Sequence, residues 1–477
     1  TIARLMMVAT NMMKKIPIMF APFADKMRAE GLPSIVIETF NHYYKKLLEG
    51  ETGFIKESDI YPVEALPDMG SFNGNVADTG RAAISKTVLI KLNGGLGTSM
   101  GLAKPKSLIK VKQELSFLDI IARHAIHHGT PLIFMNSFVT REDTLEILKQ
   151  YPRLWENDIG IDFVQHKVPK INQADFTPAL WPQAPHMEWC PPGHGDIYTA
   201  LQTSGMLERL LVAGYEYAFV SNVDNLGAVL NLSILGYFSQ QQISFMMEVT
   251  DRTEADKKGG HLAQLVNGQL ILRESAQCPA ADIASFEDVS RHKYFNTNNL
   301  WINLVALKSI MAANNNILGL SLIRNAKTLD PRNIQSPPVY HLETAMGSAI
   351  SVFENAQALR VPRHRFSPVK TTNDLLLVRS DAYLLTDDYL VVPDPARQGD
   401  FPVVELDTRH YKFIDDFEAR FPAGIPSLSS CSGMSVKGDI KFAGNITLIG
   451  DVHLDNNSGS QVNITANSVI NGSQRWR

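Results

Sequence analysis

Apolar residues follow two different periods along the chain, and each period predicts a different kind of element. Between Pro33 and Leu48 the spacing is helical, which predicts a helix that ends at Gly50. The apolar and aromatic positions of this helix are Ile35, Val36, Phe40, Tyr43, Tyr44 and Leu47. Four breaker residues then predict a loop, namely Pro62, Pro67, Gly70 and Gly74. Residues 1–75 are therefore expected to form a helical N-terminal segment.

From Lys86 onwards, short β-branched runs alternate with helical patterns. The runs predict strands over residues 87–92, 108–111, 131–135, 161–164 and 217–220. Ser116-x-x-Asp119 and Thr140-x-x-Asp143 have the capping-box pattern and begin helices that reach residues 128 and 150, and residues 198–212 predict a further helix. This alternation indicates a largely parallel sheet covered on both faces, with ligands at the carboxyl ends of its strands. Asn267-Gly268 predicts an antiparallel hairpin inserted after the 217–220 strand.

The pattern changes again after residue 400. Glycines recur every six positions, and pairs of apolar residues recur between them at the same interval: Gly438, Gly444 and Gly450, with Ile440/Phe442, Ile446/Leu448 and Val452/Leu454. A six-residue period of this kind predicts a short parallel β-helix in which each hexad forms one side of a coil. An ordinary two-sheet β-domain is the alternative. A β-helix of so few coils leaves a strand edge open, and an open edge favours pairing with another copy.

Composition and charge narrow the class of protein. The chain has 477 residues, of which 44% are hydrophobic and 20% charged, as in ordinary globular proteins of two or three domains. A net charge of −4 gives no support for a nucleic-acid or membrane-surface partner, and no apolar run approaches the roughly 20 residues of a membrane span. Three scattered cysteines fit neither a disulfide framework nor a zinc site, so a reducing, cytoplasmic location is expected. Residues 1–24 are basic and free of acidic residues, and the sequence leaves open whether they form a targeting segment or an amphipathic helix.

The most informative stretch is the glycine-rich loop after the 87–92 strand. Asn93-Gly94-Gly95-Leu96-Gly97-Thr98 contains three glycines in four positions, which permit positive φ and let backbone N–H groups converge on a phosphate. Lys104 and Lys106 follow and place positive charge near this loop. Neither the P-loop pattern nor the dinucleotide fingerprint fits the glycine spacing. A glycine-rich turn without a ligand remains the plain alternative.

Three further places carry candidate chemistry. Asp224 follows an apolar strand, where a carboxylate can hold Mg²⁺ between phosphates, although an Asp at this position is also a common turn or capping residue. Asn222, two residues earlier, faces the same side of the extended chain and suits a ribose or sugar hydroxyl. The turn Pro191–Asp196 contains two glycines that allow a ligand close to the backbone. Lys370 in PVKTTND is either a lysine of a polar pocket or a solvated surface charge.

Several long motifs resemble those of a known family. LNGGLGTSMG followed by PKS is similar to the signature of the eukaryotic-type UDP-glucose pyrophosphorylases (UTP–glucose-1-phosphate uridylyltransferases). The likeness continues in order through WCPPGHGDIY, FVSNVDNLGA, MEVTDRTEADKKGG, FNTNNLWI, HLETAMGSAI and PVKTTNDLLLV, and so covers most of residues 85–380. The resemblance implies an α/β fold with a doubly wound, mixed and mainly parallel nucleotide-binding sheet, over residues 76–385. It also implies a small C-terminal left-handed parallel β-helix over residues 386–477, associated with a homo-oligomer.

The resemblance also implies a reaction and roles for individual residues. The reaction is uridylyl transfer from UTP to glucose 1-phosphate, with Mg²⁺ as cofactor, giving UDP-glucose and pyrophosphate. Lys106 and Lys370 are then the catalytic lysines, with Lys104 as an alternative to Lys106, and Asp224 is the metal ligand. The implied substrate-binding residues are Leu92, Asn93, Gly94, Gly95, Gln165, Gly193, His194, Asn222, Gly259, Gly260, Asn296 and Glu343. Among these, Gln165 is expected to read the uracil, and Gly193 and His194 to contact the base and the sugar phosphate.

Other functions remain as alternatives at this point. The same chemistry on galactose 1-phosphate or N-acetylglucosamine 1-phosphate, or on a broad range of sugar phosphates, depends on pocket shape rather than on motifs. A non-catalytic nucleotide-sugar binding protein would be expected to lack Lys106, Asp224 or Lys370, and all three are present. A nicotinamide dehydrogenase is disfavoured by the glycine spacing.

Overall fold

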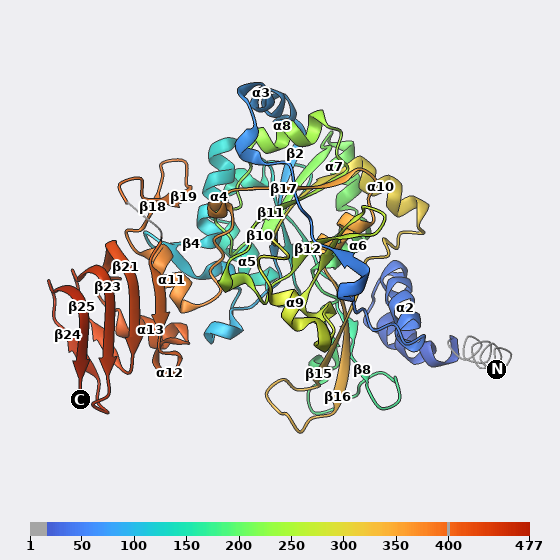
Figure 1. The fold of residues 1–477 in the computed structure, drawn as a ribbon. Coiled ribbons are helices and arrows are strands. Elements are labelled where there is room, and N and C mark those ends of the chain that lie inside the picture. The colour runs from blue at the N-terminus through green and yellow to red at the C-terminus, as the bar shows by residue number, and fades with distance from the viewer. Residues whose placement is uncertain (1–16, 398–400) are drawn as a thin grey trace. The chain divides into compact units, whose positions relative to one another are not determined.

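The computed structural model describes residues 17–397 and 401–477 (Figure 1). The chain divides into two compact units. The first unit comprises the described residues up to Ile90 together with Asp162–Val220 and Leu230–Val361. The second comprises Lys91–Ile161, Ser221–Val229 and Pro362–Arg477. The predicted boundaries at residues 75 and 385 stay a prediction. Within the described ranges, every helix is too short or too polar to cross a lipid bilayer.

The main sheet has ten strands, with the order β1-β12-β14-β10-β2-β5-β6 and with β11, β13 and β17 attached to it. Its strands are β1 (Ile60–Tyr61), β2 (Thr87–Asn93), β5 (Leu132–Asn136), β6 (Asp162–Val164), β10 (Tyr217–Asn222), β11 (Phe245–Asp251), β12 (His261–Leu265), β13 (Leu270–Arg273), β14 (Tyr294–Asn303) and β17 (Ala356–Arg360). The core of the sheet is parallel, whereas β14 runs antiparallel to both β10 and β11. The predicted α/β fold is therefore confirmed as a mixed sheet with a parallel core, although antiparallel pairings join β1, β12, β13 and β14 to it.

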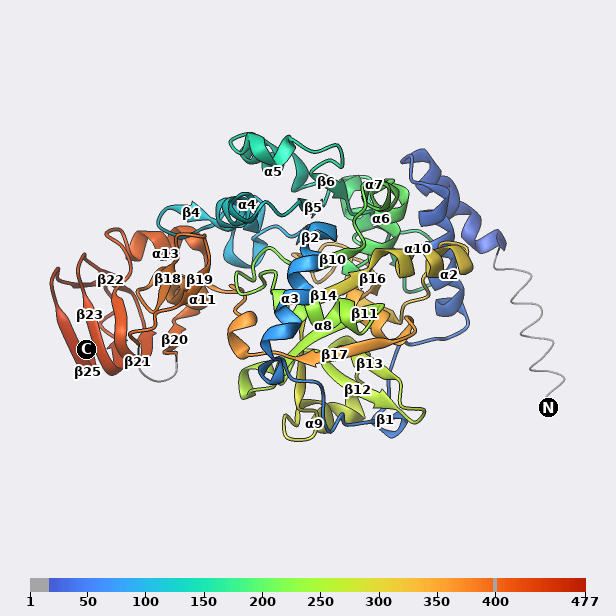
Figure 2. The same ribbon diagram turned by 90° about the horizontal axis from the view of Figure 1, so that it is seen from above.

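The residues of β5 belong to the second unit, and those of β2 and β10 are divided between the two units. The remaining elements of the first unit are helices and short strands. They are a helix that includes residues 17–29, α2 (Ser34–Leu48), α3 (Gly74–Ala83), α6 (Ile197–Thr203), α7 (Met206–Val212), α8 (Leu232–Gln240), α9 (Ile283–Glu287), α10 (Leu304–Ala313), β7 (Val168–Pro169), β8 (Ile171–Asn172), β9 (Trp189–Cys190), β15 (Leu322–Thr328) and β16 (Pro338–Thr344). Figures 1 and 2 both show α3 beside α8. Their backbones meet so closely that a Cβ on Gly80 would lie 1.9 Å from the carbonyl oxygen of Leu232.

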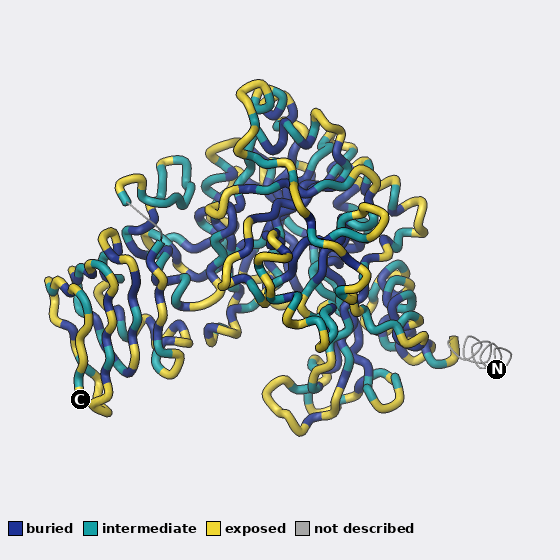
Figure 3. Tube along the Cα trace, viewed as in Figure 1, coloured by how far each residue is buried: buried dark blue, intermediate teal, exposed yellow. Residues whose placement is uncertain are grey.

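Burial follows the predicted apolar pattern in this unit. The aromatic residues of α2 pack with Phe20 and Phe23 of the preceding helix, as predicted for an amphipathic N-terminal segment; the first 16 residues of that segment lie outside the described residues. The strands of the central sheet are mostly buried and the loops exposed (Figure 3). Met246 and Met247 of β11 are fully buried, as expected for core residues.

The second unit contains the helices after the glycine loop and the C-terminal strands. Its elements are β3 (Lys110–Lys112), β4 (Leu115–Ser116), α4 (Phe117–His128), α5 (Arg141–Leu148), α11 (Thr372–Arg379), β18 (Tyr383–Leu385), β19 (Val391–Pro393), β20 (Val403–Leu406), α12 (Thr408–Tyr411), α13 (Ile414–Arg420), β21 (Ser427–Lys437), β22 (Ile440–Phe442), β23 (Thr447–Asn456), β24 (Val462–Ile464) and β25 (Val469–Trp476). Strands β20, β21, β23 and β25 pair in parallel, as do β22 and β24 (Figure 1). This pairing confirms the predicted parallel C-terminal structure, with its strands in one four-stranded and one two-stranded sheet.

The spacing of paired residues departs from a strict hexad. Met434 pairs with Val452, 18 positions away, but Thr447 pairs with Val469, 22 positions away. The predicted apolar pairs are nevertheless buried, from Ile440 and Phe442 to Val452 and Leu454. Extra residues are accommodated where the strand register shifts between Ile449 and His453. The left-handed sense of the coil stays a prediction.

Four sequence predictions of local structure need correction. Gly74 opens α3 instead of ending a loop, and the predicted 198–212 helix is two helices, broken where Gly205 adopts φ of +70°. The 108–111 strand starts only at Lys110, because Lys106–Leu108 forms a 3₁₀ turn, η5. The capping box at Ser116 and Asp119 is confirmed, with Gly129 ending α4 in the left-handed region. Thr140 does not cap α5, because its hydroxyl accepts the Ser137 N–H instead.

Candidate active site

The glycine-rich loop folds back on itself as a small hairpin within the second unit. Leu96 and Pro105 form an antiparallel bridge, and the Lys106 N–H donates to the Gly95 carbonyl at 3.2 Å. The Gly97 N–H donates to the Lys104 carbonyl, also at 3.2 Å. This pairing returns the chain to the start of the loop, so that Lys106 lies at its base. Its neighbour Lys104 is exposed.

The expected positive φ does not occur at the three glycines of the motif. Among the described residues of the loop, only Gly101 adopts it, with φ of +81°. Gly97 packs closely against Leu102, since a Cβ there would lie 2.9 Å from that side chain. Gly95 is different: a Cβ would meet no atom within 4 Å. Its backbone therefore faces open space, as a phosphate cradle requires.

Lys106 and Asp224 form an ion pair at the centre of this cluster. The Lys106 Nζ lies 2.6 Å from Asp224 Oδ2, and the two side chains are 15% and 18% exposed. The second carboxylate oxygen, Oδ1, is buried and has no hydrogen-bond partner in the described part of the chain. A buried carboxylate oxygen without a donor is costly unless a cation or water satisfies it. Asp224 therefore offers a free oxygen ligand of the kind that Mg²⁺ prefers.

Backbone pairing joins the Lys370 segment to the same place. The Val369 N–H donates to the Asp224 carbonyl at 3.0 Å, and Asn225 and Pro368 form an antiparallel bridge. The Asn225 amide reinforces this join through the Arg365 carbonyl and the Ser367 N–H, each at 3.0 Å. Lys370 itself is exposed, with its Nζ 5.7 Å from the centre of the Phe366 ring. The structure thus brings Lys106, Asp224 and the residue preceding Lys370 together.

The other predicted residues of the second unit mostly build the loop itself. The Asn93 amide is buried and donates to Asn136 Oδ1 and Thr144 Oγ1, both at 2.8 Å. The Leu92 carbonyl accepts the Val223 N–H, and the Gly94 carbonyl accepts the Ser137 hydroxyl. The Asn222 carbonyl accepts the Asn225 N–H at 3.3 Å.

A second cluster of predicted residues lies in the first unit, around the turn Pro191–Asp196. Gly193 adopts φ of +81°, and a Cβ there would lie 2.3 Å from the Thr344 carbonyl oxygen, so only glycine fits. The Gln165 amide donates to the Gly193 carbonyl at 2.9 Å. His194 accepts the Met346 N–H on Nδ1 at 2.9 Å. Burial lowers the pKa of His194 to about 4, so the ring is neutral at physiological pH and carries its proton on Nε2.

The four remaining predicted residues also belong to the first unit. The Asn296 N–H donates to the Gly260 carbonyl at 3.1 Å, and a Cβ on Gly347 would lie 3.3 Å from Asn296 Nδ2. Gly259 packs so tightly on Phe295 that a Cβ would lie 2.2 Å from the ring. Glu343 lies 3.7 Å from both Lys327 Nζ and His341 Nδ1. Burial alone would raise the pKa of Glu343, but His341 and Lys327 bring it below its ordinary value.

Some positioning residues were not found from the sequence. His166 donates its backbone N–H to Asp196 Oδ2 at 2.7 Å, and its ring lies 3.0 Å from the same carboxylate, which fixes the turn that contains His194. Lys91 is buried, and its Nζ donates to Ser221 Oγ and the Ala228 carbonyl, on either side of Asp224 in the sequence. A lysine inside an apolar strand is a weak signal for such a role. The His166–Asp196 pair has no signal in the sequence.

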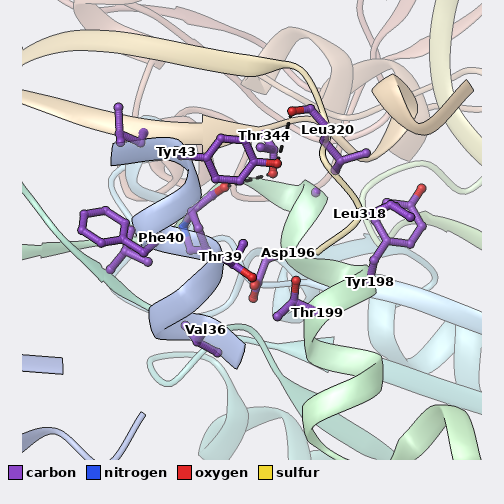
Figure 4. A pocket seen from close by; sticks show the side chains of 14 residues that line it. Val36, Thr39, Phe40, Tyr43, Asp196, Tyr198, Thr199, Leu318, Leu320 and Thr344 are labelled. Atoms are coloured by element: carbon purple, nitrogen blue, oxygen red, sulfur yellow. Dashed lines mark hydrogen bonds between the residues drawn. The ribbon is translucent and has the colours of Figure 1, made fainter. Parts of the chain in front are cut away.

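A cavity lies behind the His194 turn, but it is not a substrate site (Figure 4). Its volume is about 40 Å³, and its walls come from α2, from the turn and the following helix α6, from β7, from residues 318–320 and from β16. Thr39 and Tyr43 of α2 face Asp196 and Thr344 (Figure 4), and Val36 and Phe40 of the same helix also line the cavity. Ligand pockets measure several hundred Å³, roughly 300–1,000. This cavity is therefore a packing gap behind the turn.

Comparison with known proteins identifies the family. The family profile described as UTP–glucose-1-phosphate uridylyltransferase matches residues 37–449. A UTP–glucose-1-phosphate uridylyltransferase of Solanum tuberosum is 41% identical over 396 residues, covering 81% of this chain and 80% of that protein. A probable enzyme of the same name from Schizosaccharomyces pombe is 38% identical over 402 residues, covering 82% and 77%.

Solved structures agree with this assignment. A mutant UDP-glucose pyrophosphorylase from Leishmania major is 43% identical and superposes with a TM-score of 0.89, covering 96% of this chain and 99% of that chain. Another mutant of that enzyme, in complex with UDP-glucose, gives a TM-score of 0.88 with the same identity and coverage. The family resemblance of the motifs is thereby confirmed. The chain belongs to the UTP–glucose-1-phosphate uridylyltransferase family of nucleotidyltransferases, which make UDP-glucose from UTP and glucose 1-phosphate.

Proposed function

We propose that this protein transfers the uridylyl group of UTP to glucose 1-phosphate by direct in-line attack. A phosphate oxygen of glucose 1-phosphate forms a bond to the α-phosphorus of UTP, while the bond from that phosphorus to the oxygen bridging to the β-phosphorus breaks and pyrophosphate leaves. Such a transfer needs no covalent intermediate, only alignment of two anions and neutralisation of growing charge. The observation that carries the proposal is the Lys106–Asp224 pair beside the open backbone of Gly95.

Asp224 is the residue that would hold Mg²⁺. Its Oδ1 is buried without a partner in the described residues, and hard oxygen donors suit this ion. When bound, Mg²⁺ neutralises phosphate charge and orients the triphosphate. Lys106 Nζ already lies on the other oxygen of the same carboxylate, so its charge is positioned next to the phosphates that such an ion would bind. The exposed Lys104 is the weaker candidate for this role.

Lys370 would contribute the second positive charge. Because the Val369 N–H is hydrogen-bonded to the Asp224 carbonyl, Lys370 is tied by one residue to the metal-binding loop. Its side chain is exposed and extended over Phe366, which leaves the ammonium available to phosphate oxygens. We assign Lys370 to the phosphoryl oxygens in the transition state. The backbone from Leu92 to Gly95 would bind the nucleotide phosphates. The Asn222 side chain would bind a ribose or sugar hydroxyl.

The first-unit cluster would bind the base and the sugar phosphate. Gln165 keeps its amide oxygen for the uracil edge while its nitrogen donates to the Gly193 carbonyl. Neutral His194 offers an Nε2–H donor that Met346 holds in one orientation. Gly259, Gly260, Asn296 and Glu343 are assigned to the sugar pocket. The backbone hydrogen bond between Asn296 and Gly260 holds these two residues together and supports their assignment. At Gly259 the close packing against Phe295 is by itself a sufficient reason for a glycine.

Two wider properties belong to the same proposal. Strand β25 is the edge of the four-stranded parallel sheet, and its Val469 is 66% exposed, which supports self-association through the C-terminal strands. The cysteines Cys190, Cys278 and Cys431 are free thiols, and this supports a reducing, cytoplasmic location.

The test is pyrophosphate release from UTP and glucose 1-phosphate as a function of Mg²⁺ concentration. We expect Asp224→Asn to lower kcat/KM by at least about 100-fold and to raise the Mg²⁺ requirement. The matched control is Asp415→Asn, at an exposed position of α13 in the same unit, and it should keep wild-type activity. An Asp224→Asn enzyme with wild-type rates would overturn the metal assignment. Turnover with galactose 1-phosphate or N-acetylglucosamine 1-phosphate, but not with glucose 1-phosphate, would instead change the substrate.

A further inference from the structure

We propose that His124, His128 and Asp388 form a binding site for a divalent transition-metal ion, best matched by Zn²⁺. One ligand atom from each of these residues lies within 4.8 Å of the other two. All three residues belong to the second unit, and none has a role in the uridylyl transfer proposed above. The site is separate from the Mg²⁺ site at Asp224 in both its residues and its donor chemistry.

The two histidines are arranged by the helix that carries them. They stand four positions apart on α4, so they lie on one face, and their ring centres are 4.5 Å apart. His128 Nε2 lies 3.5 Å from Asp388 Oδ2. In a tetrahedral Zn²⁺ site with ligands at about 2.0–2.1 Å, neighbouring ligand atoms are about 3.3 Å apart. The observed separation of this pair is therefore close to that of two ligands of one ion.

Surrounding hydrogen bonds fix the ligands as metal sites usually require. His124 Nδ1 lies 2.8 Å from the Asp388 carbonyl oxygen and must donate its hydrogen to it, so the other ring nitrogen keeps a lone pair. The Thr386 hydroxyl donates to Asp388 Oδ1 at 2.6 Å and leaves Oδ2 facing His128.

The donor set selects the kind of ion. Two imidazole nitrogens and one carboxylate oxygen suit Zn²⁺, Ni²⁺ or Cu²⁺, whereas Mg²⁺ prefers oxygen donors alone. Such an ion would link α4 to the turn between β18 and β19. Helix α4 and this turn are already in contact, since the Arg123 guanidinium lies 5.5 Å from the Tyr389 ring centre. Helix α4 packs on η5, which begins with Lys106, and β18 packs on α11, which begins two residues after Lys370. Occupancy of the site would therefore stabilise the supports of both lysines.

The experiment measures Zn²⁺ binding to the full chain after chelator treatment, in buffer with excess Mg²⁺ and without nucleotide. We expect one Zn²⁺ per chain by titration calorimetry, and absorption bands of tetrahedral Co²⁺ when Co²⁺ replaces it. His128→Gln should weaken binding by at least about 10-fold. His127→Gln is the matched control, because His127 is the exposed neighbour on the same helix and is not one of the three ligands. It should bind like the wild type.

Thermal unfolding gives an independent readout. Zn²⁺ should raise the unfolding midpoint of the wild type and of His127→Gln, but not that of His128→Gln, since only a bound ion stabilises the folded state. Asp388→Asn, which retains the oxygen that Thr386 contacts, provides a second ligand variant with the same expected loss. Substoichiometric binding by the wild type, or equal binding by the His127 and His128 variants, would overturn the proposal. Because no substrate is present, failure here leaves the proposed uridylyl transfer unaffected.

Discussion

Lys106 Nζ lies 2.6 Å from Asp224 Oδ2, although the two residues are 118 positions apart in the sequence. The hairpin that follows the glycine loop supplies the lysine, and the turn after β10 supplies the carboxylate. The pair is mostly buried, and it joins the candidate phosphate cradle to the candidate metal ligand. Without Asp224 the Lys106 ammonium would lose its counter-charge, and without Lys106 the Asp224 carboxylate would lose its own.

The first prediction separates the two lysines beside the loop. Lys106→Ala should lower kcat/KM for UDP-glucose formation by at least about 100-fold, because it removes a mostly buried charge next to the phosphates. Lys104→Ala should lower it by less than about 10-fold, since Lys104 is exposed and screened by solvent. Steady-state kinetics of the two variants, side by side, make the comparison. A larger loss in the Lys104 variant would reverse the assignment.

The second prediction concerns Lys370. Lys370→Ala should lower kcat by at least about 100-fold while UTP binding changes little, as expected for a group that acts mainly in the transition state. Lys412→Ala is the matched control, because Lys412 is another exposed lysine of the second unit whose Nζ lies 5.5 Å from an aromatic ring. Single-turnover kinetics together with UTP titration separate chemistry from binding. Equal losses in kcat and in UTP affinity would argue for a ground-state role.

The third prediction is a pH dependence of stability at His194. The folded state holds the pKa of this ring at about 4, below its ordinary value of about 6.5, so the unfolded chain binds the extra proton more readily. The wild type should therefore lose stability as the pH falls from about 6.5 to about 4, by at most about 3 kcal/mol from this residue. His194→Asn keeps an acceptor for the Met346 N–H and should lose less over this window. Denaturant midpoints at a series of pH values test this; parallel curves for the two proteins would contradict it.

The fourth prediction separates backbone strain from steric clash at Gly193. Gly193→Ala meets both, because φ is +81° and the new Cβ would lie 2.3 Å from the Thr344 carbonyl oxygen. Gly31→Ala meets strain alone, because φ is +72° but the Cβ would have open space. We expect a cost of about 1 kcal/mol for Gly31→Ala and at least about twice that for Gly193→Ala, with a raised KM for glucose 1-phosphate in the latter only. Thermal unfolding and kinetics measure both, and equal costs would show that the turn tolerates the clash.

The fifth prediction addresses self-association. If the β25 edge pairs with another copy, the mass measured by light scattering should rise with protein concentration. Val469→Lys should keep the protein at the monomer mass, because a charge on an edge strand opposes pairing. Val403→Lys is the control, since Val403 is 67% exposed on β20, at the opposite edge of the same sheet. A wild type that remains monomeric at all concentrations would reject this oligomer.

The sequence by itself determined the features that depend on local chemistry. Helix α2, the capping box of α4, the Asn267-Gly268 hairpin and the buried apolar pairs of the C-terminal strands follow from periodicity and turn residues. Long motifs of defined order also indicated the family and pointed to Lys106, Asp224 and His194. The prediction of a single helix over residues 198–212 was wrong, because the helical spacing of apolar residues continues through Gly205, where the backbone leaves the helical conformation.

Only the tertiary structure decided which of these residues meet. The Lys106–Asp224 pair, the Val369–Asp224 hydrogen bond and the His194–Met346 hydrogen bond join segments far apart in the chain. The cluster of His124, His128 and Asp388 likewise joins distant segments, because Asp388 lies far from the two histidines in the sequence. No local propensity encodes such contacts, because they arise when strand order and loop pairing bring distant segments together. Charge, tautomer and metal affinity then depend on those contacts, since burial and neighbouring groups set the pKa of each side chain.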